Sequence, residues 1–461
     1  MSLQAKLLYW FQGELDDSDC KQHLPHAFTV PPNCSQIHIC FSFTPQRVGG
    51  VDNLLTLTLF DPSGFRGAGH RGGHTHRVHI GAFEATPGYC PGVLAPGEWV
   101  VQVDTHMVMA GQPCRYDLQV SGIEADGHKP QAASPSTDCA LSAPAERGPG
   151  WYRGDLHTHT THSDGQSSVP ELIQVARDRG LDFLALTDHN TVSGLREIAY
   201  CSQPDLLVVG GLELTTFWGH ALCLGAHEWI DWRVRPGEGG MARIAAEAYG
   251  RGQVLVIAHP RSIGDPDCTG CRWLYPEMMP GTARVIEVWN GPWNGDSGNE
   301  EALALWYDWL NQGVRMVATA GTDIHGGQAG GGPLGYSVVY ADSLSEAGLL
   351  RALRAGHLYL SSGPRLEFAA RAVDGREAMM GDHVAAGPAV FTIRWDECPP
   401  QATLRMVQDG QVADQWPCAG QGHREWTPPG GRARWCLPEV RGTDSAMLAV
   451  ANPLFVWERR R

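Results

Sequence analysis

The sequence has no long hydrophobic run and no excess of positive charge. A membrane-spanning helix needs about 20 consecutive apolar residues, whereas the most hydrophobic runs, 206–209 and 254–258, have only the length of strands. The 35 Lys and Arg residues against 50 Asp and Glu residues give a net charge of −15. Nucleic-acid affinity comes largely from cationic side chains. We therefore expect neither a membrane span nor a nucleic-acid partner.

The sequence also lacks a secretory signal and a disulfide framework. The first residues, MSLQAK, have no basic region followed by an apolar one, which favours a cytoplasmic protein. The 13 cysteines show no regular spacing of the kind found in small disulfide-rich domains. The single CxxC pair, Cys268 and Cys271, stands among Asp, Pro and Gly. We interpret this pair as two free thiols in a loop rather than as a zinc or redox site.

The composition predicts folded domains that are rich in strands and turns. Hydrophobic residues make up 43% of the chain, and there are 56 Gly and 31 Pro residues. Residues 1–123 consist of short alternating segments, such as 36–43 and 54–60, which predict a β-sandwich. Residues 124–150 are rich in Pro, Ala and Ser and predict a linker. Residues 365–461 return to short β segments and predict a small C-terminal β domain.

Residues 151–364 alternate apolar strands with helical windows, the pattern of an α/β sheet or barrel. The predicted helices cover 169–179, 241–250, 300–312 and 345–355. The predicted strands cover 183–187, 206–210, 221–225, 254–258, 285–289, 315–320 and 336–340. Active sites of parallel α/β folds lie at the carboxyl ends of the strands, so polar residues just beyond these runs are candidates for chemistry.

His and carboxylate residues do follow these runs. His157 and His159 are two residues apart, so in an extended backbone both side chains point the same way, and Asp164 follows after a turn. Further candidates come directly after later strands or open the next one: Asp188, His189, Glu213, His220, His259, Asp323 and His325. A single residue of this kind is usually a capping or buried polar group. So many in one region predict a polynuclear metal site.

The motifs HTHTTHSDG, LTDHN, GLEL, WGH, AHP and GTDIHG resemble, in this order, those of the polymerase and histidinol phosphatase (PHP) superfamily of metal-dependent hydrolases. The β region before them and the C-terminal segment ANPLFV resemble the carbaryl-hydrolase-like (CehA/McbA) branch. The resemblance implies a distorted (β/α)7 barrel, flanked here by the N-terminal β-sandwich and the C-terminal β domain.

The resemblance also implies nine ligands for two or three divalent ions. Glu213 would bridge two ions, and the full set is His157, His159, Asp164, His189, Glu213, His220, His259, Asp323 and His325. His157, His159 and Asp323 would hold the first ion, His220 and His259 the second, and Asp164, His189 and His325 the third. Imidazole and carboxylate ligands suit Zn, Mn or Fe(II). Such clustered ions bring a bridging water to hydroxide near neutral pH.

Four residues outside this ligand set are candidates for other roles. Asp188 and Glu287 are candidates to orient a ligand imidazole. His162 is a general acid, a substrate contact or a surface residue, and we favour the last. Arg261 either holds a substrate phosphate or pairs with a nearby aspartate. A second HxH pair, His74 and His76, has no carboxylates following it, so we interpret it as part of a solvated strand or hairpin.

The leading functional hypothesis is a phosphoesterase that acts on a small-molecule, glycan-linked or lipid-linked ester. Hydrolysis of a carboxyl ester or an aryl carbamate needs the same metal centre and is the alternative. Arg or Lys near the ions would favour phosphate, and an apolar pocket lined by Trp would favour an aryl ester. A non-catalytic binding protein that keeps its metals is a third hypothesis. The β domains are expected to brace the barrel and to form a lid. The sequence predicts no oligomeric state.

Overall fold

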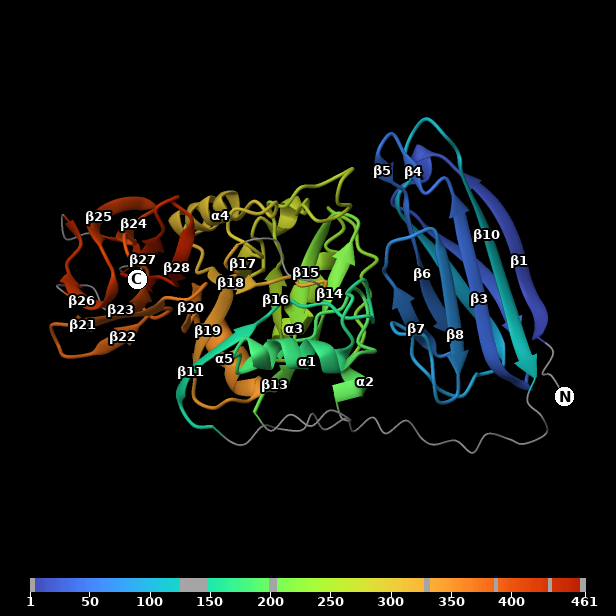
Figure 1. Cartoon of the computed structure of the whole chain (residues 1–461), viewed down its shortest axis with the longest axis horizontal. Helices are drawn as coiled ribbons and strands as arrows, with labels where there is room; N and C mark the ends of the chain where they lie inside the picture. Colours follow the sequence, from blue (N-terminus) through green and yellow to red (C-terminus); the bar gives the residue numbers. More distant parts are fainter. Residues whose placement is uncertain are drawn as a thin grey trace.

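The computed structural model describes residues 5–124, 147–198, 205–326, 332–384, 389–429 and 433–456. An N-terminal pair of β-sheets lies at one end of the molecule, a region of strands and helices lies in the middle, and the C-terminal strands lie at the other end (Figure 1). The described part is therefore a mixed α/β protein with many strands and few helices. The predicted linker falls almost entirely outside the described residues.

The N-terminal region consists of two four-stranded antiparallel sheets, with the strand orders β1-β10-β3-β8 and β2-β9-β6-β7. Alternate residues of β3 are buried, including Ile37, Ile39 and Phe41, because an apolar face repeats every second residue in a strand. The elements are β1 (Ala5–Leu15), η1 (Asp17–Asp19), β2 (His23–Val30), β3 (Cys34–Thr44), β4 (Arg47–Val48), β5 (Val51–Asp52), β6 (Leu54–Asp61), β7 (Gly64–Gly69), β8 (Thr75–Gly81), β9 (Gly97–Met107) and β10 (Cys114–Glu124).

The middle region carries the helices. Its strands are β11 (Gly150–Asp155), β12 (Phe183–Ala185), β13 (Leu207–Val209), β14 (Gly211–Thr216), β15 (Gly219–Leu224), β16 (Val254–Ile257), β17 (Val285–Asn290), β18 (Val317–Gly321), β19 (Tyr336–Ala341) and β20 (Leu358–Ser361). Its helices are α1 (Val169–Asp178), α2 (Leu195–Ile198), α3 (Gly240–Gly250), η2 (Pro276–Met278), α4 (Asn299–Asn311) and α5 (Glu346–Ala355). All four predicted helices are present, within one residue at each end.

Local sequence explains where two of these helices begin and end. Ser168 and Glu171 form a capping box before α1, in which each side chain bonds the backbone N–H of the other. The Ser345 hydroxyl accepts a hydrogen bond from the backbone of Gly348 at the start of α5. Gly356 ends α5 with a φ of 80°, which a residue with a side chain rarely adopts.

The strands of the middle region form two open sheets, and no closed barrel is found among the described residues. One sheet has the order β14-β15-β16-β17-β18, and the other begins β13-β12-β11-β19-β20. Only two residues, Phe217 and Trp218, connect β14 to β15, so these strands pair antiparallel. A parallel pair would need a crossover of about a dozen residues. The strands of the middle region thus form two mixed sheets, which isolated bridges join at Thr158–Ile324 and His189–Glu213, and the expected distorted (β/α)7 barrel is not confirmed.

The C-terminal strands continue the second sheet. β20 pairs with β28, so the sheet runs across the predicted domain boundary at residue 364. A separate four-stranded sheet, β22-β21-β23-β26, shares a core with it. The elements are β21 (Arg365–Ala372), β22 (Glu377–Met379), β23 (Ala389–Cys398), β24 (Thr403–Gln408), β25 (Gln411–Pro417), β26 (Gly420–Trp426), β27 (Trp435–Arg441), β28 (Met447–Ala451) and β29 (Leu454–Phe455). None of the helices in the described residues is long and apolar enough to cross a membrane.

Candidate metal centre

The nine predicted ligands lie together between the ends of the two sheets of the middle region. They form four overlapping groups, and within each group the donor atoms lie within 4.8 Å of one another. The groups are His157, His159 and Asp323; His157, Glu213 and His259; His189, Glu213 and His220; and His159, Asp164, His189 and His325. Glu213 lies where two groups meet. His220 and His259 share Glu213 but fall in different groups, a division that differs from the one implied by the family resemblance.

The donor atoms at this centre fit divalent ions. Buried side-chain nitrogen and oxygen atoms almost always have a hydrogen-bond partner. Here seven of them, all on predicted ligands, are buried without one: His157 Nε2, both ring nitrogens of His159, Asp164 Oδ1, Glu213 Oε2, His220 Nε2 and Asp323 Oδ1. Among them, the Nε2 atoms of His157 and His159 lie 2.8–3.5 Å from Glu213 Oε2 and Asp323 Oδ1. Such a set of unsatisfied imidazole and carboxylate atoms is what a metal ion would complete.

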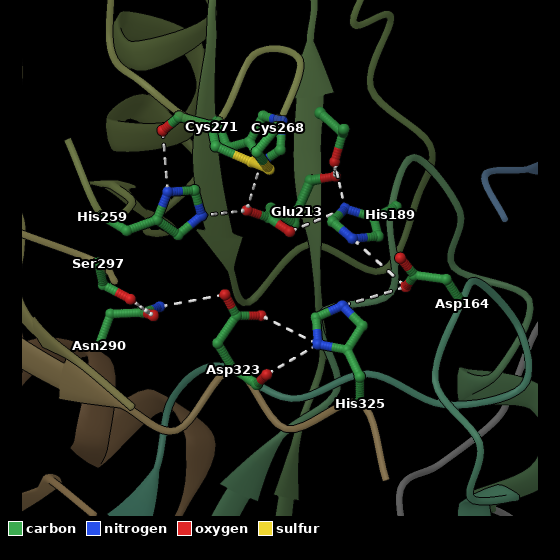
Figure 2. Close-up of a disulfide and its surroundings, with 12 residues drawn as sticks. Asp164, His189, Glu213, His259, Cys268, Cys271, Asn290, Ser297, Asp323 and His325 are labelled. Atoms are coloured by element: carbon green, nitrogen blue, oxygen red, sulfur yellow. Dashed lines mark hydrogen bonds and ion pairs between the residues drawn. A yellow bond between two sulfur atoms is a disulfide. The ribbon is translucent and has the colours of Figure 1, made fainter. Parts of the chain in front are cut away.

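Neighbouring groups fix the orientation of two of these imidazoles. His157 donates from Nδ1 to the Glu287 carboxylate at 3.1 Å. Figure 2 shows the second contact, in which His259 donates from Nδ1 to the Cys271 carbonyl oxygen at 3.0 Å. In both rings Nε2 then faces Glu213, at 3.4 and 3.1 Å. An imidazole that donates from one nitrogen offers the lone pair of the other to a metal. The surroundings therefore set the tautomer that binding requires.

The electrostatics of the centre favour ionised carboxylates. Burial alone would raise the pKa of the Glu213 carboxyl, but the surrounding imidazoles, His189 first, hold it well below its usual value. Burial by itself would lower the pKa of His325, but the hydrogen bond to Asp164 and the negative charges of Asp323 and Asp164 together outweigh burial and raise this pKa to about 10. Protons on imidazoles thus balance the carboxylates. Divalent ions would take over this role and release the protons.

The backbone is strained at three points of the centre. Asn190, His259 and Asp323 have positive φ values of 55°, 25° and 51°, in the left-handed region that side chains disfavour. Such conformations persist where surrounding contacts enforce them, and they cluster at functional sites. Gly321 lies two residues before Asp323. A side chain at this position would clash, because its Cβ would lie 2.4 Å from the Cβ of His157. These strained conformations reduce the free energy of unfolding, and the contacts around Asn190, His259 and Asp323 must offset that loss.

Asp188 and Glu287 both support the centre, by different contacts. Glu287 accepts hydrogen bonds from His157, from the backbone of His259 and from Asn290. The hydrogen bonds of Asp188 come from the backbone and hydroxyl of Thr160 and from the Ser163 hydroxyl, at 2.7–2.8 Å. Asp188 therefore holds the segment between His159 and Asp164, whereas the sequence predicted that it would orient an imidazole.

His162 is buried, at 5% exposure, so our interpretation of it as a surface residue is wrong. Its Nδ1 accepts hydrogen bonds from the Ser193 hydroxyl and the Gly88 backbone, and its Nε2 donates to Glu197 at 2.9 Å. These contacts link the loop that contains His162 to α2 and to the N-terminal sandwich. A local pattern could not predict this burial because the Gly88 contact comes from a segment 74 residues away.

Arg261 and the second HxH pair, His74 and His76, have other environments. Arg261 is absent from the described residues that line the cavity beside the centre, and Asp265 pairs instead with Lys21 at 2.6 Å. In the second HxH pair, His74 donates to Gln46, whereas His76 is buried rather than solvated. Neither histidine belongs to a group of potential metal donors.

Cys268 and Cys271 form a disulfide, so the interpretation of free thiols is wrong. Gly270, with a φ of 78°, turns the chain tightly enough to bring the two Cα atoms within 5.5 Å. The disulfide lies beside Glu213 and His259 (Figure 2). It closes the loop whose Cys271 carbonyl orients His259.

A cavity of about 440 Å³ opens beside the centre and has two walls. Six predicted ligands and the disulfide loop line one wall. The N-terminal sandwich lines the other, with the segment around the β4–β5 hairpin and with His70, which follows β7. His70 is not among the residues predicted for the site, because it stands outside the strand-end pattern of the middle region. The only signal was its position at the start of the histidine-rich segment 70–79.

Residues 155–230 match the family model of the PHP domain. They include six of the nine donors, and His259, Asp323 and His325 lie beyond them. A 5'-3' exoribonuclease from Haemophilus influenzae is 38% identical over 65 residues, which are 14% of this chain and 24% of that protein. A phosphoribosyl 1,2-cyclic phosphate 1,2-diphosphodiesterase from Eggerthella lenta is 38% identical over 66 residues, with the same two shares. The chain thus spans about a quarter of the length of these curated relatives.

A solved structure of a two-domain protein from Bacteroides vulgatus, containing a predicted PHP-like metal-dependent phosphoesterase, is 17% identical. The comparison covers 68% of this chain and 98% of that one, with a TM-score of 0.39. The match to the family model is local, but residues 155–230 contain the first six donors of the candidate centre. This segment is therefore similar to a PHP domain.

Proposed function

We propose that this chain is a metal-dependent phosphoesterase with two or three divalent ions at a His, Asp and Glu centre. The observation that carries the proposal is the set of buried, unpartnered donor atoms that converge around Glu213. The ligands we propose are the nine residues predicted from sequence, and Glu213 is the bridging one. The PHP match over 155–230 supports a hydrolase.

The chemistry divides between the ions and the chain. Adjacent divalent ions supply a nucleophile from water near neutral pH and stabilise the charge that develops on phosphoryl oxygens. The residues of the chain would hold the ions and orient the ligand side chains. Glu287 and the Cys271 carbonyl fix the rings of His157 and His259, Asp188 fixes the loop before Asp164, and the cavity receives the ester.

The donor set suits Zn, Mn or Fe(II), because it combines imidazoles and carboxylates without a thiolate. Both nearby sulfur atoms are joined in the disulfide. Two of the relatives that match this chain act, by their names, on phosphate esters of nucleotides or ribose, which supports phosphate over a carboxyl ester or an aryl carbamate. The carbaryl-hydrolase-like branch stays a prediction from the sequence motifs.

Elemental analysis combined with substrate assays tests the proposal. The purified chain is analysed for bound metal and then assayed with Mn, Zn or Fe(II) on p-nitrophenyl phosphate, bis-p-nitrophenyl phosphate, an aryl acetate and an aryl carbamate. We expect two or three ions per chain and turnover of a phosphate ester. Turnover of the acetate or carbamate alone would replace the proposal with the carboxyl-ester hydrolase. Metal without any turnover would favour a binding protein.

A further inference from the structure

The wall of the cavity opposite the metal centre belongs to the N-terminal sandwich. Leu54 and Met107 give this wall apolar surface, and Arg47, Asn53 and His70 give it polar groups. The other wall includes predicted ligands. A substrate in the 440 Å³ between them would touch both parts of the chain at once.

The ring of His70, a residue of the sandwich, contacts the ring of the predicted ligand His189. Its ring centroid lies 4.6 Å from that of His189 and 4.7 Å from that of His106. Its Nδ1 is buried and has no hydrogen-bond partner among the described residues. A buried polar atom without a partner costs free energy unless a ligand or water completes it. This atom therefore points to a group that enters the cavity.

Contacts across the interface hold the sandwich in this position. The Gly88 backbone N–H donates to Ser193 at 3.1 Å, and the Thr191 hydroxyl donates to the Gly88 carbonyl at 2.9 Å. Phe65 stacks on Trp229 with ring centroids 4.3 Å apart. Since polar and apolar contacts both fix the interface, His70 has a defined place over the centre.

We propose that His70 binds the substrate: its imidazole donates a hydrogen bond to an oxygen of a phosphate ester whose organic part lies against Leu54 and Met107. This inference rests on the proposed function and specifies its substrate as a small-molecule phosphate ester. The cavity has the volume of a small-molecule site, about 300–1,000 Å³. His70 belongs to none of the four groups of metal donors, so it acts on the substrate and not on the ions.

The test compares His70→Ala and His70→Gln with the unchanged chain. His38→Ala is the matched control, because His38 is a half-buried imidazole of the same sandwich that contacts the His79 ring at a centroid distance of 4.8 Å and lies outside the cavity. Each protein is measured for metal content, for kcat and KM with p-nitrophenyl phosphate, and for inorganic phosphate affinity by calorimetry. Cleavage of a short oligoribonucleotide is measured for the unchanged chain.

We expect His70→Ala to keep its metal, to lose about 10- to 100-fold in kcat/KM mainly through KM, and to bind phosphate more weakly by a similar factor. His70→Gln should regain part of this loss, and His38→Ala should behave like the unchanged chain. A fall in metal content would overturn the inference by making His70 a ligand. Unchanged constants, an equal loss in the control, or preferred cleavage of the oligoribonucleotide would also overturn it.

These outcomes separate the two proposals. If the unchanged chain hydrolyses phosphate esters and His70→Ala does so equally well, only the role of His70 fails. If the metal-loaded unchanged chain hydrolyses no phosphate ester and turns over an aryl ester or carbamate, the proposed function fails and this inference fails with it.

Discussion

Replacing Glu213 by glutamine removes one negative charge from the middle of the centre and keeps the shape of the side chain. The carboxylate is fully buried and lies 2.8 Å from His189, 3.1 Å from His220 and 3.1 Å from His259. Two of the four donor groups contain it. The substitution should therefore weaken two ions at once, whereas a change at any ligand of one ion would weaken only that ion.

The size of the effect follows from the charge that is lost. If the carboxylate charge is shared between two divalent ions, each ion interacts with about half a unit charge, so the product of charges equals that of two unit charges. Two unit charges about 4 Å apart interact by about 4 kcal/mol at an effective dielectric constant of about 20. A factor of ten in affinity corresponds to about 1.4 kcal/mol, so each of the two ions should bind about a thousandfold more weakly. Turnover should fall by at least a similar factor, on the order of 1,000-fold, because both ions take part in the reaction.

Metal content after dialysis and kcat with p-nitrophenyl phosphate measure this prediction. Glu301→Gln, an exposed carboxylate on α4, is the control for the chemical change and should behave like the unchanged chain. Circular dichroism checks that both variants fold. A Glu213→Gln protein that keeps every ion and near-normal turnover would refute the bridging assignment.

Four smaller predictions follow from other contacts. Asp188→Asn should keep part of the metal and lose about 10- to 100-fold in turnover, as changes to groups that support ligands do, and metal analysis with kinetics checks both. Removing the ions with EDTA should lower the melting temperature, since ions at a hundred times their Kd stabilise by about 2.7 kcal/mol, and adding back Zn or Mn should restore it. Reducing the Cys268–Cys271 disulfide with dithiothreitol should lower metal retention by freeing the loop that orients His259, and the double serine variant should show the same loss without responding to dithiothreitol. The hydrogen bond to Glu346 raises the pKa of His227, so its stabilisation is full below the ordinary pKa of about 6.5 and is lost as pH rises through the folded value; His227→Ala should lower the melting temperature more at about pH 6 than at about pH 9.

Many donors of the candidate centre could be predicted because they closely follow an apolar strand in the sequence. His157 and His159 share a face two residues apart at the end of β11, and His259 comes two residues after β16. Asp323 follows β18 in the same way. An apolar strand followed by a polar residue is a short pattern, and strand ends that meet in space bring such residues together. The structure adds the distances between these residues, which no spacing in the sequence contains.

The arrangement of the strands was less predictable. Glu213 was predicted to follow a strand, and it lies within β14, which pairs antiparallel with β15. The segment 206–216 is almost continuously apolar or small, and such a run does not show that β13 ends at Val209 and a new strand of another sheet begins at Gly211. The pairing of β20 with β28 is also invisible locally, because it joins residues about 90 positions apart.

The wall of the cavity that the N-terminal sandwich forms could not be predicted from sequence. It depends on contacts between distant parts of the chain, and these contacts also bear on function. His70 stands in a segment rich in Gly and His, and such composition is typical of an exposed turn. Its burial depends on Phe65 and Gly88 packing on the middle region, which are contacts between parts of the chain more than 100 residues apart. The same local motifs can supply a metal centre in many proteins, so these motifs by themselves do not select a substrate. The groups that select a substrate must come from what covers the centre, and here the sandwich covers it. Differences in specificity between this chain and its partial relatives should therefore lie in residues that the matched segment does not contain.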